Sequence, residues 1–365
     1  MSQPRLLHPL MGVNPRTLLS LIAQNGTGQY PLHLGLITAT AFFRWPFSAY
    51  ERWQVERTEM AAASNRPPLF ILGHWRSGTT FLYNILSRSP QFAYMAPLAT
   101  GLPWDFLTLG NLLRPVLEKA LPKGRFIDQV PVNPDSPQED EIALASMQTV
   151  SFYHGLYFPK HFSKNFNAGI FFEGCTAAEI DTWCWTMQHL CKKLQIQYPE
   201  QQLLIKNPVY TARVKLLKQL FPNAKFVHIY RNPYVVFQST LNFYKKLLKE
   251  LALQGFDQVP YRQIVLESYP KMMQALLEDT ASLAGTDFIE IRFEEFETDP
   301  LKYLRQIYSQ LSLAGWETAE PYFSAYLSSQ KNYQKNRYAF PQEDIQQVAA
   351  HWHTFLERWD YQPPA

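Results

Sequence analysis

The sequence predicts an α/β fold, in which a central parallel β-sheet is flanked by helices and joined by a helical N-terminal segment and a helical cap. Three observations lead to this prediction. Short, continuous apolar runs recur along the chain, and such runs are typical of strands buried in a parallel sheet. Each run is followed by a short turn and then by a helix with one apolar face. Short strands that alternate with longer helices indicate a parallel sheet covered on both faces.

Composition limits the class of protein. Of the 365 residues, 46% are hydrophobic and 18% are charged, which excludes a disordered or fibrous chain. The 34 Lys and Arg residues nearly balance the 31 Asp and Glu residues, and a net charge of +3 argues against broad nucleic-acid binding. The aromatic share is 15%. Core packing explains most of it, and an aromatic-lined pocket would explain the excess.

Residues 1–66 form the predicted helical N-terminal segment. Asn14 as N-cap and Pro15 as first helical residue mark the start of its first helix. Residues 32–53 are unusually apolar in their first half. This run predicts a helix buried against the body of the protein, and the alternative is a membrane-surface hairpin or a lid over an apolar substrate.

Neither a signal peptide nor a membrane-spanning segment is expected. The N-terminus lacks a signal-peptide pattern, and the apolar stretch 32–43 is too short to span a bilayer. The three cysteines, Cys175, Cys184 and Cys191, have no metal-ligand spacing and indicate a reducing compartment. These features predict a cytoplasmic protein and leave peripheral membrane contact open.

Residues 67–365 form the predicted α/β domain. Its strands are expected at the apolar runs 69–73, 203–205, 225–230 and 288–291. Besides the helices that follow these strands, long helical stretches are expected over roughly 102–120, 137–150, 176–196 and 234–284.

The stretch from Gly73 to Thr80 is the most informative part of the sequence. It follows a predicted strand and opens a helix, where backbone N–H groups and the helix dipole favour an anion such as phosphate. Its glycines fit the P-loop pattern G-x-x-x-x-G-K-[ST], but Thr79 replaces the lysine that reaches the β- and γ-phosphates of a nucleoside triphosphate. That replacement argues against an ATPase or kinase. Arg76 instead indicates a ligand with a 5′-phosphate and a further anionic group.

A second motif follows the predicted strand 225–230. Arg231 stands at the carboxyl end of this strand, where open α/β sheets bind their ligands. Pro233 suits the first turn of the next helix, and Ser239 lies about two helical turns further along. An arginine can grip a phosphate bidentately, and a serine donates a hydroxyl hydrogen bond. The pair therefore predicts a second phosphate site.

The two motifs together resemble those of sulfotransferases that use 3′-phosphoadenosine 5′-phosphosulfate (PAPS). The resemblance covers roughly residues 67–360 and is nearest to a bacterial-type branch with an Arg-Ser-Gly-Thr-Thr loop, distantly similar to the tyrosylprotein sulfotransferases. It implies a P-loop-like sheet, a loop that binds the 5′-phosphosulfate, and an Arg–Ser pair that grips the 3′-phosphate. The nucleotide-binding residues that it implies are Arg76, Ser77, Gly78, Thr79, Thr80, Arg231 and Ser239.

The resemblance also implies residues for the transfer step. Lys206, in a Lys-x-Pro motif at a strand end, and Arg76 would stabilise charge in the transition state. The tyrosylprotein branch carries a glutamate about twenty residues beyond the loop as base, but residues 96–100 contain no carboxylate here. The acidic cluster 135–141 is the expected replacement, with Glu139 as first candidate for the base and Glu141 as second. The same cluster also suits the first turn of a helix.

Other residues have weaker sequence support. For His74 and His154, a structural or substrate-contacting role is favoured over that of a base. Phe293 occupies a position that borders the adenine in relatives, where stacking on a purine and core packing are near-equal alternatives. Lys335 and Arg337 lie in a stretch that resembles a basic loop over the 3′-phosphate, although the relatives' glycine is absent and a solvated charge run is slightly favoured.

The sequence therefore predicts a sulfotransferase that moves a sulfuryl group from PAPS to a hydroxyl, or less readily an amine, of an organic acceptor. The expected co-product is adenosine 3′,5′-bisphosphate, and no metal is expected. The acceptor is a small molecule or lipid-like and not a nucleic acid. Two alternatives remain. One is a P-loop-like kinase or NTPase, and the other is a non-catalytic, membrane-associated nucleotide-binding protein, which is supported only by the apolar N-terminus.

Overall fold

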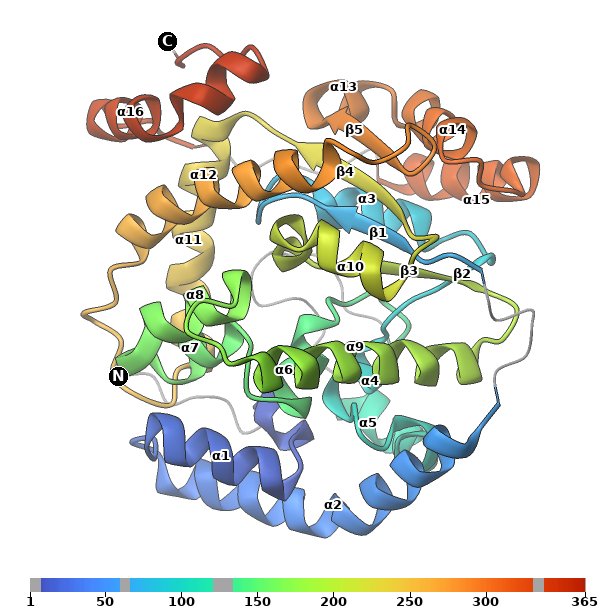
Figure 1. Ribbon diagram of the computed structural model, residues 1–365, viewed down its shortest axis with the longest axis vertical. Coiled ribbons are helices and arrows are strands. Elements are labelled where there is room, and N and C mark those ends of the chain that lie inside the picture. The colour runs from blue at the N-terminus through green and yellow to red at the C-terminus, as the bar shows by residue number, and fades with distance from the viewer. Residues whose placement is uncertain (1–7, 60–65, 121–133, 331–337, 365) are drawn as a thin grey trace. The chain divides into compact units, whose positions relative to one another are not determined.

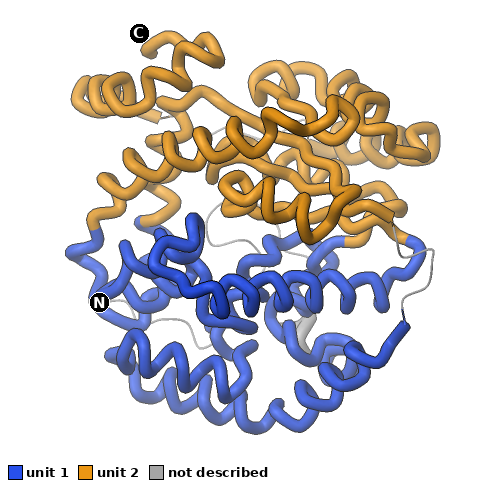
Figure 2. The backbone as a smooth tube through the Cα atoms, viewed as in Figure 1, with its two compact units in different colours: residues 1–65, 94–200, 245–259 blue, residues 66–93, 201–244, 260–365 orange. Residues whose placement is uncertain are grey.

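The computed structural model describes residues 8–59, 66–120, 134–330 and 338–364. The protein is mostly helical and contains a five-stranded sheet (Figure 1). The chain divides into two compact units, which Figure 2 shows in different colours. Unit 1 comprises residues 1–65, 94–200 and 245–259, and unit 2 comprises residues 66–93, 201–244 and 260–365. The predicted domain division after residue 66 stays a prediction.

The sheet lies in unit 2, and every pair of neighbouring strands is parallel. Its order is β2-β3-β1-β4-β5, and the bounds are Leu69–Leu72 for β1, Phe92–Ala93 for β2, Gln202–Lys206 for β3, Lys225–Tyr230 for β4 and Phe288–Arg292 for β5. The predicted fold class is confirmed. The sequence did not indicate β2, because two residues are too short to carry a periodic pattern.

The order of the strands creates a ligand position at the carboxyl end of β1. Leu69 of β1 lies opposite Leu204 of β3 on one side and Lys225 of β4 on the other. The chain builds β2 and β3 on one side of β1 and then crosses to build β4 and β5 on the other. Open α/β sheets bind ligands at such a reversal, beyond the carboxyl ends of the strands. The segments that follow β1, β3 and β4 are therefore the ones to search.

Helices flank the sheet in unit 2 (Figure 1). Helix α12 contacts α10, α16 and the 3₁₀ turn η5, whereas α15 contacts α3 and α14. The bounds are Thr79–Leu86 for α3, Pro208–Ala212 for η5, Val214–Leu220 for α10, Tyr261–Thr280 for α12, Phe293–Thr298 for α13, Pro300–Gln310 for α14, Trp316–Ser329 for α15 and Gln342–Arg358 for α16.

The helical stretch predicted over 234–284 is two helices. Helix α11 spans Pro233–Leu251, and α12 begins at Tyr261. The intervening segment contains Gly255 and ends at Pro260, both poor helix residues. Its backbone also has partners outside a helix, because the Leu253 N–H donates to the Tyr157 carbonyl at 2.9 Å. The prediction failed here because apolar periodicity continues on both sides of the break.

Unit 1 is helical throughout its regular structure. Its first helix, α1, spans Pro15–Asn25 and starts where the sequence predicts, with Asn14 Oδ1 accepting from the Thr17 N–H at 2.8 Å. The other elements are η1 (Pro9–Gly12), α2 (Pro31–Arg57), α4 (Pro97–Gly101), η3 (Phe106–Gly110), α5 (Asn111–Ala120), α6 (Glu141–Met147), α7 (Tyr153–Tyr157), η4 (Pro159–His161), α8 (Phe162–Phe171) and α9 (Ala177–Gln197).

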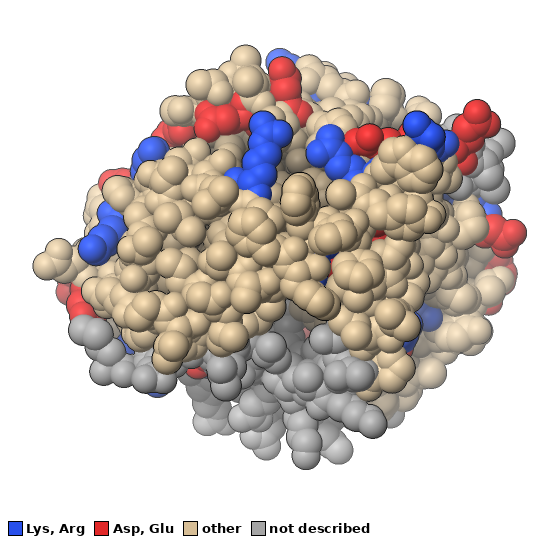
Figure 3. Space-filling view, turned by 90° about the horizontal axis from the view of Figure 1, so that it is seen from below, with Lys and Arg blue, Asp and Glu red and all other residues tan. Residues whose placement is uncertain are grey.

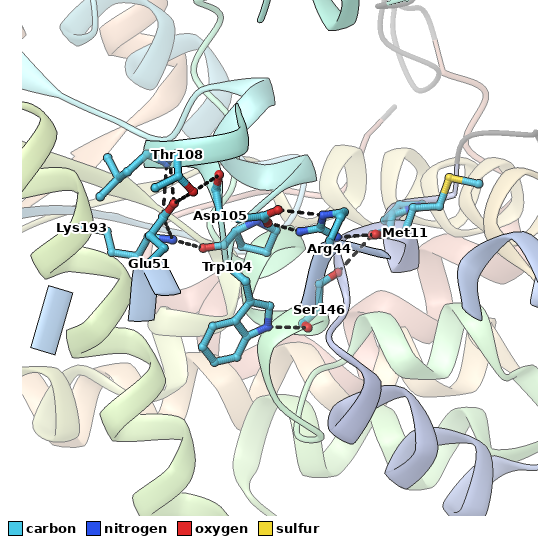
Figure 4. A network of polar contacts seen from close by, with 11 residues as sticks. Met11, Arg44, Glu51, Trp104, Asp105, Thr108, Ser146 and Lys193 are labelled. Atoms are coloured by element: carbon cyan, nitrogen blue, oxygen red, sulfur yellow. Dashed lines mark hydrogen bonds and ion pairs between the residues drawn. The ribbon is translucent and has the colours of Figure 1, made fainter. Parts of the chain in front are cut away.

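Buried ion pairs fasten α2 to the rest of unit 1 (Figure 4). Arg44 pairs with Asp105 and also donates to the Met11 carbonyl at 2.6 Å. About two helical turns further along α2, Glu51 forms an ion pair with Lys193 at 2.6 Å. Glu51 also accepts a hydrogen bond from the backbone N–H of Thr108 at 2.8 Å. Each of these charged groups is nearly or fully buried, so each needs its partner to offset lost hydration.

The prediction that residues 32–53 form a buried helix is right for one face of α2 and wrong for the other. The face that carries Arg44 and Glu51 is buried, whereas Phe43 is 70% exposed and Trp45 is 59% exposed. Apolar composition alone predicted burial, but ionic contacts decide which face of this helix turns inward. No helix within the described ranges has both the length and the apolar character that crossing a bilayer requires.

Candidate active site

The loop after β1 turns tightly before it enters α3. Gly73 has a φ of +145° and Gly78 a φ of +102°, which are conformations that favour glycine. A Cβ at Gly73 would lie 2.6 Å from Ser77 Oγ, and one at Gly78 would lie 2.1 Å from the ring of Phe293. Arg76 also has a positive φ, +71°, which is unusual for an arginine. Such backbone strain concentrates at ligand-binding loops.

Ser77 presents a hydroxyl that has no hydrogen-bond partner in the part of the chain that the structure describes. The residue is 2% exposed, and among the described residues nothing hydrogen-bonds to its Oγ. Leaving a buried hydroxyl unsatisfied is costly, so a ligand oxygen at this position would recover that free energy. The hydroxyl lies immediately before the N-terminus of α3, where the helix dipole favours an anion. The residues present therefore fit a bound phosphate or sulfate group.

Lys206 ends β3 and reaches the same loop. Its side chain is buried, and its Nζ lies 3.4 Å from Thr80 Oγ1 on the first turn of α3. The next turn of the chain is tied to the loop as well, because Thr211 Oγ1 accepts from the Gly73 N–H at 2.8 Å. The ends of β1 and β3 are thus held together by hydrogen bonds. The structure places a buried ammonium group beside the first turn of α3.

The second motif meets the first one. Ser239, on α11, accepts from Arg76 Nε at 2.8 Å, and Arg231, just after β4, donates to the Arg76 carbonyl at 3.4 Å. Burial lowers the pKa of Arg231, and the nearby charge of Arg76 lowers it further, against the opposing effect of Glu294. Two guanidinium groups held this close repel each other, so an anion between them would be stabilised.

Phe293 supports this arrangement from α13. The residue is buried, its ring contacts the position above Gly78, and the guanidinium of Arg231 lies 4.4 Å from the ring centroid. A cation over an aromatic face is a favourable contact. Because one face of the ring is covered by Arg231, packing accounts for Phe293 as it stands. Its stacking on a purine stays a prediction.

Tyr338 is a site residue that sequence reasoning missed. Its hydroxyl lies 2.9 Å from Ser239 Oγ, and either atom can donate. The basic pair predicted to cover the 3′-phosphate, Lys335 and Arg337, lies outside the described residues. Tyr338 follows this pair directly in the chain, which was the available signal. A tyrosine hydroxyl is a donor suited to a phosphate oxygen.

The two predicted bases belong to unit 1. Glu141, the first residue of α6, is fully buried, and Ser151 donates to its Oε1 at 2.6 Å. This anchored position favours a structural role for Glu141. Glu139 is half-buried in the segment before α6. Its assignment as the base stays a prediction.

Both candidate histidines are enclosed. Burial lowers the pKa of His74 to about 4, and its Nδ1 lies 2.9 Å from the Trp75 carbonyl. Burial lowers the pKa of His154 to about 4 as well, although hydrogen bonds to the carbonyls of Ala145 and Thr149 oppose the shift. These contacts account for His154 as a packed, hydrogen-bonded group, whereas Nε2 of the buried His74 has no hydrogen-bond partner among the described residues.

The fold and the loop define an α/β protein whose side chains at the carboxyl ends of β1, β3 and β4 suit an anionic ligand. The family model described as "Sulfotransferase family" matches residues 67–318, more than half of the chain. The chain belongs to the sulfotransferase family.

Relatives agree with this assignment. The omega-hydroxy-beta-dihydromenaquinone-9 sulfotransferases Stf3 of Mycobacterium bovis and Mycobacterium tuberculosis are each 30% identical over 297 residues, which are 81% of this chain and 75% of theirs. The solved structure of sulfotransferase STF9 from Mycobacterium avium aligns over 96% of this chain and 98% of its own, with a TM-score of 0.65 and 15% identity. STF1 from Mycobacterium tuberculosis aligns over 85% of each chain, with a TM-score of 0.58 and 14% identity. The two solved structures support the fold.

Proposed function

We propose that this chain transfers a sulfuryl group from PAPS to a hydroxyl of a lipid-like or other small organic acceptor and releases adenosine 3′,5′-bisphosphate. The observation that carries the proposal is the meeting of Arg76, Arg231 and Ser239 beside the unpartnered hydroxyl of Ser77. Hydrogen-bond donors converge there, and they suit two anionic groups on one nucleotide. Membership of the sulfotransferase family supports the chemistry.

Each residue has a role in this mechanism. Bound PAPS supplies an activated sulfuryl group. Ser77 and the N–H groups that open α3 would orient the 5′-phosphosulfate, while Arg231 and Ser239 would bind the 3′-phosphate. Arg76 and Lys206 would stabilise charge as the bond from the acceptor oxygen to sulfur forms and the bond from sulfur to the nucleotide phosphate breaks. Glu139 would accept the proton of the acceptor hydroxyl.

The names of the relatives support a class of acceptor. Both curated relatives are named for an omega-hydroxylated dihydromenaquinone, a lipid with a hydroxyl group. We extend this class to the present chain as a lipid-like acceptor with an accessible hydroxyl. Such an acceptor needs an apolar cavity that leaves one polar end at the sulfur.

Calorimetry with adenosine 3′,5′-bisphosphate tests the donor site. We expect the wild-type protein to bind this nucleotide in preference to magnesium ATP. Arg231→Gln should weaken binding roughly 10- to 150-fold, as the loss of a charge-assisted hydrogen bond does. Arg305→Gln is the matched control, because Arg305 is an exposed arginine whose carboxylate partner, Glu320, lies at 3.5 Å. Binding of magnesium ATP without binding of the bisphosphate would overturn the proposal.

A further inference from the structure

Helix α2 has its charged residues inside and its aromatic residues outside. One face is buried, with spacings of three and four residues, and consists of Ile37, Ala41, Arg44, Ser48, Glu51 and Val55. A surface helix of a water-soluble protein shows the opposite pattern, with its apolar side inward and its charges in solvent. The ion pairs of Arg44 with Asp105 and of Glu51 with Lys193 fix this orientation.

The outward face is rich in large apolar side chains. Of the twelve large apolar residues that are exposed in the described chain, nine lie on α1 or α2: Leu19, Leu32, Leu36, Phe42, Phe43, Trp45, Phe47, Tyr50 and Trp53. We call these nine residues the apolar face. Figure 3, which views the side that carries α1 and α2, shows a broad surface without charge that is bordered by Lys and Arg and also by Asp and Glu. Scattered exposed apolar residues are normal, but a gathered patch marks a binding surface.

Charged side chains are scarce along α1 and α2. The first fifty residues contain no Asp or Glu and three Arg, of which Arg44 is buried against Asp105 and Arg16 is exposed on α1. The first carboxylate of the chain, Glu51, is buried against Lys193, and the exposed Glu56 is paired with Arg52 at 2.8 Å. Arg57 lies over the ring of Trp53 at 4.4 Å from its centroid, so a cation borders the aromatic residues. Between Arg16 and Glu51 the described chain therefore exposes no charged side chain, and the exposed carboxylates of Glu56 and Glu59 follow at the end of α2.

We propose that the apolar face of α1 and α2 docks on the interface of an anionic lipid bilayer. Trp and Tyr rings are favoured at the level of the headgroups, where the ring is apolar and its polar atom stays hydrated. Phe and Leu side chains enter the acyl boundary, while arginines contact lipid phosphates. A helix of 27 residues laid flat would present about 40 Å of this surface to the membrane. The inference does not depend on the proposed transfer reaction.

A second copy of the chain is the competing occupant. An interface between two copies is self-complementary and carries hydrogen bonds and charged groups across it. From residue 17 to residue 50 the only Lys, Arg, Asp or Glu is Arg44, which is buried against Asp105, so this face offers a second copy no ion pair. The bilayer is therefore the occupant that the uncharged face supports.

Flotation with vesicles tests the proposal in the absence of any nucleotide. We expect the wild-type protein to float with vesicles of phosphatidylcholine and phosphatidylglycerol, and more weakly with phosphatidylcholine alone. Phe43→Ser combined with Trp45→Ser should reduce the partition coefficient roughly 100-fold, because two large exposed rings are lost. Tyr322→Ser is the matched control, since Tyr322 is an exposed aromatic residue of α15 in unit 2, and it should float like the wild type.

A second measurement locates the contact. Brominated lipid chains should quench the fluorescence of the wild-type protein, and Trp45→Phe combined with Trp53→Phe should remove most of the quenching while flotation persists. The proposal is overturned if the wild type stays in the aqueous fraction at every lipid composition. It is also overturned if the protein forms a dimer that Phe43→Ser with Trp45→Ser dissociates and neither form floats. Nucleotide binding would be untouched by these results, which separates the inference from the proposed function.

Discussion

Gly78 is the residue at which the loop, α3 and α13 meet. Its φ of +102° and the ring of Phe293, 2.1 Å from an added Cβ, leave no space for a side chain. The sequence marks this glycine through the loop pattern, but only the fold reveals that Phe293 occupies the space above it. The residue therefore serves packing as well as close approach of a ligand to the backbone.

Replacement of Gly78 by alanine should destabilise the protein. We expect Gly78→Ala to lower the free energy of unfolding by about 2–3 kcal/mol, because it combines a left-handed conformation with overpacking against Phe293. Denaturant unfolding measures the change. Gly285→Ala is the matched control, as nothing lies within 4 Å of a Cβ there. Equal midpoints for the two variants would contradict the contact described here.

The residue scale also shows which parts of the site were predictable. Arg76, Ser77, Arg231 and Ser239 were predicted because each lies in a short motif next to a strand. Tyr338 was missed because its contact with Ser239 spans 99 residues, and its place directly after the predicted basic pair was the only local signal. Glu141 was a candidate base because it stands in an acidic run, and its hydrogen bond to Ser151 could not be foreseen from that run.

At the scale of elements, His154 joins α6 and α7. Its ring nitrogens lie 2.8 Å from the Ala145 carbonyl and 3.1 Å from the Thr149 carbonyl, and the side chain is buried. Burial lowers the pKa of His154 from its ordinary value of 6.5 to about 4. The folded state therefore keeps this ring neutral at a pH where the unfolded chain has already bound a proton.

This difference predicts how stability depends on pH. The contribution of neutral His154 to the free energy of unfolding is fully present above pH 6.5. It is lost as the pH falls from 6.5 towards 4, because the unfolded state binds more protons than the folded state in that window. We expect His154→Asn to flatten the fall in unfolding free energy between pH 7 and pH 5 by about 2 kcal/mol. Chemical denaturation at both pH values measures it. His351→Asn, at an exposed histidine, should keep the wild-type slope, and an unchanged slope in His154→Asn would refute the assignment.

Elements were predictable where one pattern determines them. The apolar runs identified β1, β3, β4 and β5, and the Asn14–Pro15 pair identified the start of α1. The break between α11 and α12 was missed because the intervening segment finds its hydrogen bonds in contacts distant in sequence. The outward face of α2 was missed because periodicity shows that a helix has two faces but not which one the ion pairs turn inward.

For the molecule as a whole, near-neutral composition conceals a local separation of charge and aromatic residues. Arginine and lysine residues gather where β1, β3 and β4 end in unit 2, and aromatic residues gather on α1 and α2 in unit 1. The first group suits one small anion, and the second suits an apolar environment. The net charge of +3 reveals neither the cationic group nor the aromatic group.

The most direct test of the proposed activity measures the fate of PAPS in the presence of a hydroxylated prenyl lipid. Mass spectrometry should detect a sulfate ester of the lipid and an equal amount of adenosine 3′,5′-bisphosphate. Lys206→Met should slow turnover about 100-fold, because it removes a group that stabilises charge in the transition state. The affinity of this variant for the bisphosphate should stay within about threefold of the wild type. Lys302→Met, at an exposed lysine, should turn over normally. A sulfate ester formed with this dependence on Lys206 is the expected result, and consumption of ATP with PAPS left intact would contradict the proposed activity.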